Sequence, residues 1–173
     1  MWTPYLTIQD VNGLESDRFI KIFGNVVEHC LAAGIGILKN RPFNSVEDVV
    51  HAVVTYLDNL KLTEKEKILQ LYPDSVSKLA GFSNSMLEFN THQKIVNSSR
   101  SLRFEEKKRL KQLSKDYRDY FGFPFIICSK EDDIDTICAT MESRLKNCKE
   151  KEIEIAMNEV KKICKLRIHE IVQ

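Results

Sequence analysis

Histidine is the commonest acid–base group in enzyme sites, and arginine is well suited to binding a carboxylate. The four histidines of this chain are His29, His51, His92 and His169, and each alone is more commonly a structural or surface residue than a catalyst. Arg167 lies beside an apolar stripe on the last predicted helix. A partly buried arginine needs a partner, because an isolated buried charge is costly. That partner is either a carboxylate of the same chain or a substrate carboxylate, which a guanidinium can bind through two parallel hydrogen bonds.

An aromatic turn is the most distinctive segment of the chain. Three phenylalanines fall within five residues, in Phe121-Gly122-Phe123-Pro124-Phe125. Gly122 can adopt a positive φ, and Pro124 fixes its own φ and disfavours helix at the residue before it. The helix before this segment must therefore end here. Its rings could form the floor of a binding site, or they could pack the helix terminus into the core.

Composition and motifs argue against several functional classes. With 26 basic and 25 acidic residues the formal net charge is +1, so no global field favours nucleic acid or an anionic membrane. There is no Gly-rich phosphate loop, metal motif or nucleophile elbow, and no apolar run that could span a bilayer. The five cysteines form no C-x-x-C pair, and we expect free thiols in a reducing compartment.

The two ends of the sequence carry no recognisable targeting signal. The first five residues lack the pattern of a secretory signal, and the last residues are not a peroxisomal tripeptide. We expect a cytoplasmic or peroxisomal protein.

Helical periodicity of apolar residues recurs along the chain, and alternating strand patterns are nearly absent. A length of 173 residues suits one domain with a sizeable core. We therefore predict an all-α fold, with residues 1–173 forming a single compact domain of about seven or eight helices. This is not a simple four-helix bundle.

Capping and breaking residues predict where the helices begin and end. A single apolar helix is expected from Val26 to Leu38, followed by a break at residues 41–43, and a later helix should stop before Pro73. Residues 74–86 are expected to form a loop, followed by helices over about 87–96 and 104–120, and by a last helix that begins near residue 151. Candidate N-caps are Ser16, Ser45, Thr63 and Ser129.

Five motifs occur in order along nearly the whole chain. They are F-x-x-x-F-G from Phe19 with Glu28 after it, R-P-F at 41–43, Y-x-x-x-F-G-F-P-F at 117–125, R-L-x-N at 144–147 followed by Glu152, and a closing helix at 160–167. The third motif is the most specific. On these motifs the chain resembles the 2-oxo-4-hydroxy-4-carboxy-5-ureidoimidazoline (OHCU) decarboxylase family of urate breakdown, as a divergent member.

The resemblance implies an all-α homodimer without a metal or organic cofactor. The family reaction removes carbon dioxide from the small-molecule ureidoimidazoline OHCU and yields (S)-allantoin. Such a site holds a substrate carboxylate near a cation and then delivers a proton to one face of the resulting carbanion-like carbon. By resemblance, the catalytic positions are Tyr72, His92, Gln93 and Arg167, and the substrate-binding positions are Pro73, Glu88 and the backbone of Phe125 and Ile126.

Two of these positions depart from the family pattern. The H-P-D-L segment is Tyr72-Pro73-Asp74-Ser75 here, so a tyrosine replaces the family's histidine, and the catalytic Glu aligns with His92. A phenol with an ordinary pKa near 10 is a poor base near neutrality. One hypothesis is therefore a degenerate homologue that acts as a ligand-binding or protein-interaction module.

The other hypothesis is a relocated base. Glu88 and His92 are four residues apart on a predicted helix and hence share a face. Glu88 could orient His92 and raise its pKa, which would place a base next to Gln93.

Overall fold

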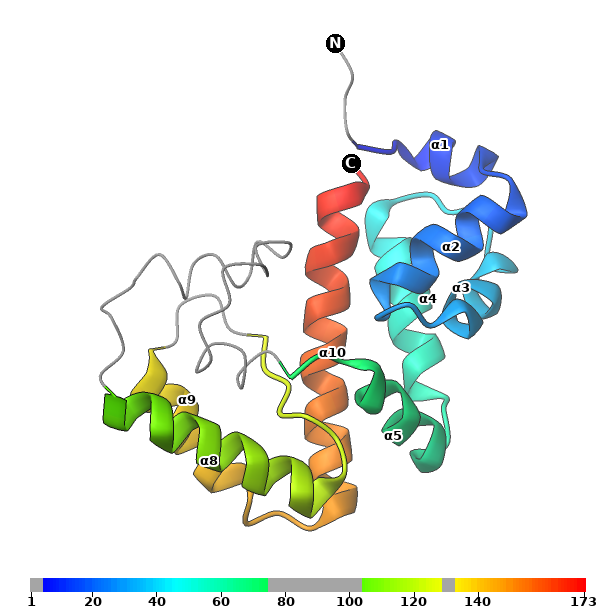
Figure 1. Cartoon of the computed structure of the whole chain (residues 1–173). Coiled ribbons are helices and arrows are strands. Elements are labelled where there is room, and N and C mark those ends of the chain that lie inside the picture. Colours follow the sequence, from blue (N-terminus) through cyan, green and yellow to red (C-terminus); the bar gives the residue numbers. More distant parts are fainter. Residues whose placement is uncertain (1–4, 75–103, 129–132) are drawn as a thin grey trace. The chain divides into compact units, whose positions relative to one another are not determined.

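Amphipathic helices make up most of the backbone of the computed structural model, which describes residues 5–74, 104–128 and 133–173 (Figure 1). The described residues contain eight helices, so the predicted all-α class is confirmed. The chain divides into two compact units, Met1–Leu71 with Met157–Gln173, and Tyr72–Ala156. The single domain over residues 1–173 stays a prediction.

The first unit is built from the N-terminal helices and the end of the chain. Helix α2 packs on α3, and α3 packs on α4. Leu6 joins the two ends of the unit, because its N–H donates to Ile171 (2.8 Å) and its carbonyl accepts from Gln173 (2.9 Å). The helices are α1 (Ile8–Gly13), α2 (Ser16–Val26), α3 (Leu31–Leu38), α4 (Val46–Asp58), α5 (Leu62–Leu71) and the part of α10 (Lys149–Ile171) that follows Ala156.

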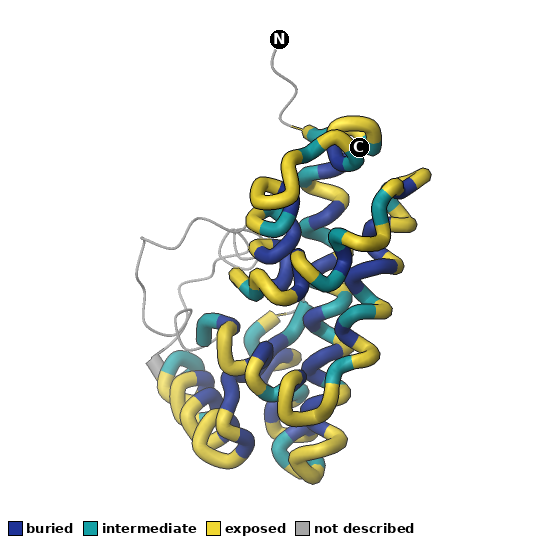
Figure 2. The backbone as a smooth tube through the Cα atoms, turned by 90° about the vertical axis from the view of Figure 1, so that its right-hand side faces the viewer, coloured by how far each residue is buried: buried dark blue, intermediate teal, exposed yellow. Residues whose placement is uncertain are grey.

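The second unit contains α8 (Phe104–Phe121), α9 (Ile134–Arg144) and the first turns of α10. Helices α8 and α9 lie side by side (Figure 1). Buried and exposed residues alternate along the helices of both units, as expected for amphipathic helices (Figure 2).

The aromatic turn ends α8 as predicted. Gly122 adopts φ 84°, and its N–H donates to the carbonyl of Arg118 at 2.8 Å, which closes the last turn of the helix. Phe121, Phe123 and Phe125 are buried around the ring of Tyr117, with centroid distances of 4.7, 6.1 and 5.3 Å. The three rings thus pack into the core of the second unit, one of the two alternatives that the sequence left open.

Several predicted helix starts need correction. The Ser45 cap is confirmed, since its side chain accepts the N–H of Asp48. Ser16 is instead the first residue of α2, after an N-cap at Glu15. Thr63 lies inside α5, because that helix begins at Leu62.

The remaining elements agree with the sequence in part. Asp133 caps α9 through the N–H of Thr136, so the predicted cap at Ser129, which is outside the described residues, is wrong. Helix α5 ends before Pro73 and the last helix begins at Lys149, close to the predicted positions. Helix α1 was not predicted, and the loop and helix expected over residues 75–96 lie outside the described residues.

The single helix predicted from Val26 to Leu38 is wrong. It is divided by a turn at Val27–Cys30, in which Glu28 and His29 adopt positive φ values of 45° and 61°. Non-glycine residues rarely adopt this conformation, so apolar periodicity could not reveal the turn. The five cysteines carry free thiols, as predicted. In the described part of the chain, none of the helices has both the length and the apolar character needed to cross a membrane.

Candidate active site

Arg167 is held by partners from the turn between α2 and α3. Its Nη2 pairs with Glu28 Oε2 at 2.8 Å, and its Nη1 donates to the carbonyl of Val26 at 3.1 Å. The side chains of Arg167 and Glu28 are only 18% and 9% exposed. An intramolecular ion pair, the first alternative for this arginine, is therefore present.

The unusual turn explains this geometry. Helix α2 ends at Val26, whose carbonyl belongs to the last turn and has no partner further along that helix. Helix C-termini carry partial negative charge, which favours a cation there. The positive φ of Glu28 then directs its carboxylate to the same guanidinium. The guanidinium of Arg167 is therefore held in one orientation, which favours bidentate binding of a carboxylate.

The segment from Tyr72 to Asp74 is anchored on α8. Asp74 accepts a hydrogen bond from the hydroxyl of Ser114 at 2.9 Å and lies 3.5 Å from the guanidinium of Arg118. Tyr72 is buried, with 6% of its surface exposed, and Pro73 is half-buried. The Tyr-Pro-Asp segment that replaces the family's H-P-D is thus held in place by a carboxylate network.

The backbone after the aromatic turn has no regular secondary structure from Pro124 to Cys128. The N–H groups of Phe125, Ile126 and Ile127 make no hydrogen bond to any residue in the described part of the chain. Phe125 and Ile126 are nonetheless buried, and unpaired buried N–H groups are rare in folded proteins. These three groups are candidate donors to a polar ligand.

A buried polar cluster lies beneath this segment. Arg144 donates to Glu152 Oε1 (2.6 Å), the carbonyl of Ile126 (2.8 Å) and the hydroxyl of Tyr117 (3.3 Å). Glu152 is fully buried and also accepts from Tyr117 and, at 3.0 Å, from Asn147. Burial raises the pKa of the Tyr117 phenol far above its ordinary value of 10; Arg144 opposes this shift and Glu152 adds to it. Tyr117 therefore acts here as a neutral donor.

Comparison with known proteins identifies the family. Residues 12–169 match the sequence profile of OHCU decarboxylase. The chain belongs to the OHCU decarboxylase family. It is 32% identical over 166 residues to a 2-oxo-4-hydroxy-4-carboxy-5-ureidoimidazoline decarboxylase of Xenopus laevis, a match that covers 94% of this chain and 93% of that protein.

Two solved structures share the fold of this OHCU decarboxylase family member. A crystal structure of (S)-allantoin synthase matches with a TM-score of 0.75 and 21% identity over 95% of this chain, which spans 54% of that longer chain. A crystal structure of OHCU decarboxylase in the presence of (S)-allantoin matches with a TM-score of 0.62 and 22% identity, covering 80% of this chain and 89% of that chain.

The structure describes five of the eight site residues predicted for this OHCU decarboxylase homologue. Arg167 belongs to the first unit. Within the second unit, Arg144 joins Phe125 and Ile126, because its guanidinium lies 4.5 Å from the Phe125 ring and binds the Ile126 carbonyl. The predicted site residues Tyr72 and Pro73 also belong to the second unit. Glu88, His92 and Gln93 lie outside the described residues.

Sequence reasoning missed the residues that contact the candidate site residues of this OHCU decarboxylase homologue, directly or through Arg144. Glu28, Arg144 and Glu152 all occur in the family motifs, but helical spacing gives no reason to pair Arg167 with Glu28. Ile127, which was not predicted, carries a third N–H that has no hydrogen-bond partner among the described residues. The positions of Glu28, Arg144 and Glu152 in the motifs could have indicated their importance, because a charged residue on a buried element requires a partner.

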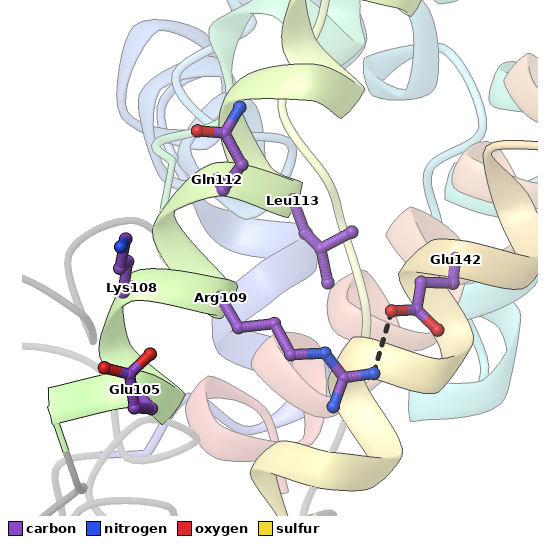
Figure 3. Close-up of a pocket in the computed structure, with 6 residues that line it drawn as sticks. All are labelled: Glu105, Lys108, Arg109, Gln112, Leu113 and Glu142. Carbon is purple, nitrogen blue, oxygen red and sulfur yellow. Dashed lines mark hydrogen bonds and ion pairs between the residues drawn. The ribbon is translucent and has the colours of Figure 1, made fainter.

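A surface groove between α8 and α9 contains none of the predicted site residues. Figure 3 shows Arg109 reaching from α8 to Glu142 on α9, where the two side chains pair at 2.8 Å. Both side chains are about half exposed, so this pair contributes little to stability. The groove is lined by Glu105, Lys108, Arg109, Gln112, Leu113 and Glu142.

Proposed function

We propose that this chain converts OHCU to (S)-allantoin by decarboxylation without a cofactor. The observation that carries the proposal is the Arg167 guanidinium, which Glu28 and the Val26 carbonyl hold in one direction. A substrate carboxylate would bind beside this cation. We also propose that the protein is a homodimer, which sedimentation equilibrium would show as twice the mass of one chain.

The reaction makes two demands on the site. The bond between the ring carbon and the carboxylate breaks, carbon dioxide leaves, and the electron pair stays on the carbon until a proton arrives at one face. The N–H groups of Phe125 and Ile126 would hold the polar edge of the ring, while the apolar side chains around them limit access of water. Selective protonation from one face gives the S product.

Proton transfer would depend on the two positions where this chain departs from the family pattern, Tyr72 and His92. Tyr72 can donate a hydrogen bond but is a poor base near neutrality. In our proposal His92 is the relocated base, oriented by Glu88, and Gln93 is a polar contact of the substrate. Pro73 would be a further contact of the substrate.

The direct test measures allantoin and its enantiomeric excess from freshly generated OHCU. We expect (S)-allantoin from the wild type, and a fall in kcat/KM of about 10²-fold or more for Arg167→Met. Arg109→Met is the matched control, because it removes an exposed arginine outside the proposed site. A wild type that forms allantoin no faster and no more selectively than the uncatalysed reaction would contradict the proposal.

The relocated base has its own test. His92→Ala should lower the rate by about 10²- to 10⁴-fold, the usual contribution of a general acid–base group. Equal rates for the two proteins would rule out His92 as the base.

A second candidate function is favoured by one observation, the tyrosine that stands where the family has its histidine. In this case the protein binds a ligand without turnover, or serves as a protein-interaction module. (S)-Allantoin at a hundred times its dissociation constant would stabilise a ligand-binding protein by about 2.7 kcal/mol. A melting temperature that does not change with ligand would favour the protein-interaction module.

A further inference from the structure

Arg144 is a buried charge with several hydrogen-bond partners that the proposed reaction does not use. It ends α9, is 7% exposed, and binds Glu152, Tyr117 and the carbonyl of Ile126. Its guanidinium also lies 4.5 Å from the centroid of the Phe125 ring. One side chain therefore holds both the ring of residue 125 and the carbonyl of residue 126.

The other members of the cluster fix the guanidinium itself. One oxygen of Glu152 accepts from Arg144 and from Tyr117, and the other accepts from Asn147 at 3.0 Å. Buried ion pairs of this kind are poor stabilising devices, since well-packed apolar residues often serve as well or better. What the cluster provides is a defined orientation for the groups that it binds.

The orientation of one peptide group follows directly. The Ile126 carbonyl and the Ile127 N–H belong to the same planar trans peptide, so they point in opposite directions. Because Arg144 holds the carbonyl, the N–H of Ile127 is directed away from the buried cluster. Ile127 is only half-buried, and this N–H makes no hydrogen bond within the described part of the chain.

We propose that Arg144, held by Glu152 and Tyr117, is a positioning residue that aims the N–H group of Ile127 at the bound ureidoimidazoline. The inference rests on the proposed function. Arg144 does not touch the substrate in this proposal. It acts through the backbone, which otherwise has no regular secondary structure to hold its direction.

The test uses a double variant that removes the orientation without leaving a buried charge. Arg144→Met alone would leave the Glu152 carboxylate buried without its cation, and the protein could fail to fold. Arg144→Met/Glu152→Gln keeps side-chain volume and retains an amide partner for Tyr117 and Asn147. The matched control is Arg109→Met/Glu142→Gln, which makes the same two changes in an exposed pair of the same unit.

Two readouts separate positioning from folding. Isoleucine-selective ¹⁵N spectra of the ligand-free proteins, assigned with Ile126→Val and Ile127→Val, report the two amide groups. Titration with (S)-allantoin and steady-state kinetics report binding and turnover. We expect a folded double variant with a shifted Ile127 amide, about tenfold weaker (S)-allantoin binding, and a fall in kcat/KM of about 10²-fold. The control should match the wild type.

A folded double variant that keeps the wild-type Ile127 amide position, dissociation constant and kcat/KM would overturn the proposal. Failure of the proposed function looks different. In that case the wild type itself neither forms nor binds (S)-allantoin, whereas the amide positions are still compared without any ligand.

Discussion

Glu28 shows how a single residue can carry backbone strain for the sake of a partner. Its φ of 45° lies in the left-handed region, where a non-glycine residue costs about 1 kcal/mol or more. The 2.8 Å pair with Arg167 offsets this cost, and the pair in turn orients the proposed substrate anchor.

Removing that carboxylate should destabilise the protein. We expect Glu28→Ala to lower the free energy of unfolding by about 1.5–3 kcal/mol, because Arg167 loses a charged hydrogen-bond partner while the strained backbone remains. Urea denaturation measures the change. The exposed Glu170 supplies the control, since Glu170→Ala should stay within about 0.5 kcal/mol of the wild type. Equal losses for the two variants would contradict this account.

Tyr117 should make the protein sensitive to alkali. Burial raises its pKa in the folded state, whereas the unfolded phenol ionises near the ordinary value of 10. Its contribution to stability is therefore constant below about pH 10 and is lost as the pH rises above this value, because only the unfolded chain then releases the proton.

The measurement compares denaturant midpoints at pH 8 and pH 11. We expect the wild type to lose more stability between these pH values than Tyr117→Phe does. Tyr120 is 62% exposed, so Tyr120→Phe should keep the wild-type pH dependence. Identical pH dependence in all three proteins would show that Tyr117 does not couple folding to the proton.

At the scale of elements, the stability of a helix depends on the residue that caps its N-terminus and on how closely it packs against its neighbours. Ser45 and Ser16 are both serines near helix starts, but only Ser45 is an N-cap with a hydrogen bond, to the N–H of Asp48 at 3.2 Å. Ser45→Ala should cost about 1 kcal/mol of stability. Ser16→Ala should remain within about 0.5 kcal/mol. Thermal unfolding of both variants tests this assignment, and a larger loss for Ser16→Ala would reverse it.

The contact between α2 and α3 depends on a glycine. A Cβ at Gly34 would lie 2.3 Å from the carbonyl oxygen of Ile20, a rigid backbone atom. Gly34→Ala should therefore destabilise the protein by about 1–3 kcal/mol. Gly13 has open space around it, and Gly13→Ala should leave stability unchanged or raise it by up to about 1 kcal/mol. Denaturant midpoints of the two variants give the comparison, and a tolerated Gly34→Ala would contradict the close packing.

At the scale of the whole molecule, α10 belongs to both compact units. Residues 149–156 of this helix lie in the second unit and residues 157–171 in the first. Because one continuous helix contributes core residues to each unit, loss of either unit should remove part of the other. We expect one cooperative unfolding transition, with equal calorimetric and van't Hoff enthalpies. Two resolved transitions would contradict the prediction of a single domain.

The sequence by itself determined the all-α class, the end of α5 before Pro73 and the end of α8 at Gly122. These features are local: periodicity, a missing N–H and a permitted positive φ act within a few residues. The ordered motifs also identified the family, since chance seldom places several of them in the right sequence. The turn at Glu28 escaped prediction, because its positive φ has no glycine to mark it.

Only the tertiary structure decided the partners of the charged residues. Arg167 pairs with a residue 139 positions away, and Arg144 binds a carbonyl 18 positions away. Sequence spacing cannot select among distant carboxylates and carbonyls, because the choice depends on which elements pack together and on which groups lose contact with water. The sequence predicted Phe125 and Ile126 as lining residues. The fold revealed that Arg144 binds the carbonyl of the peptide group between Ile126 and Ile127.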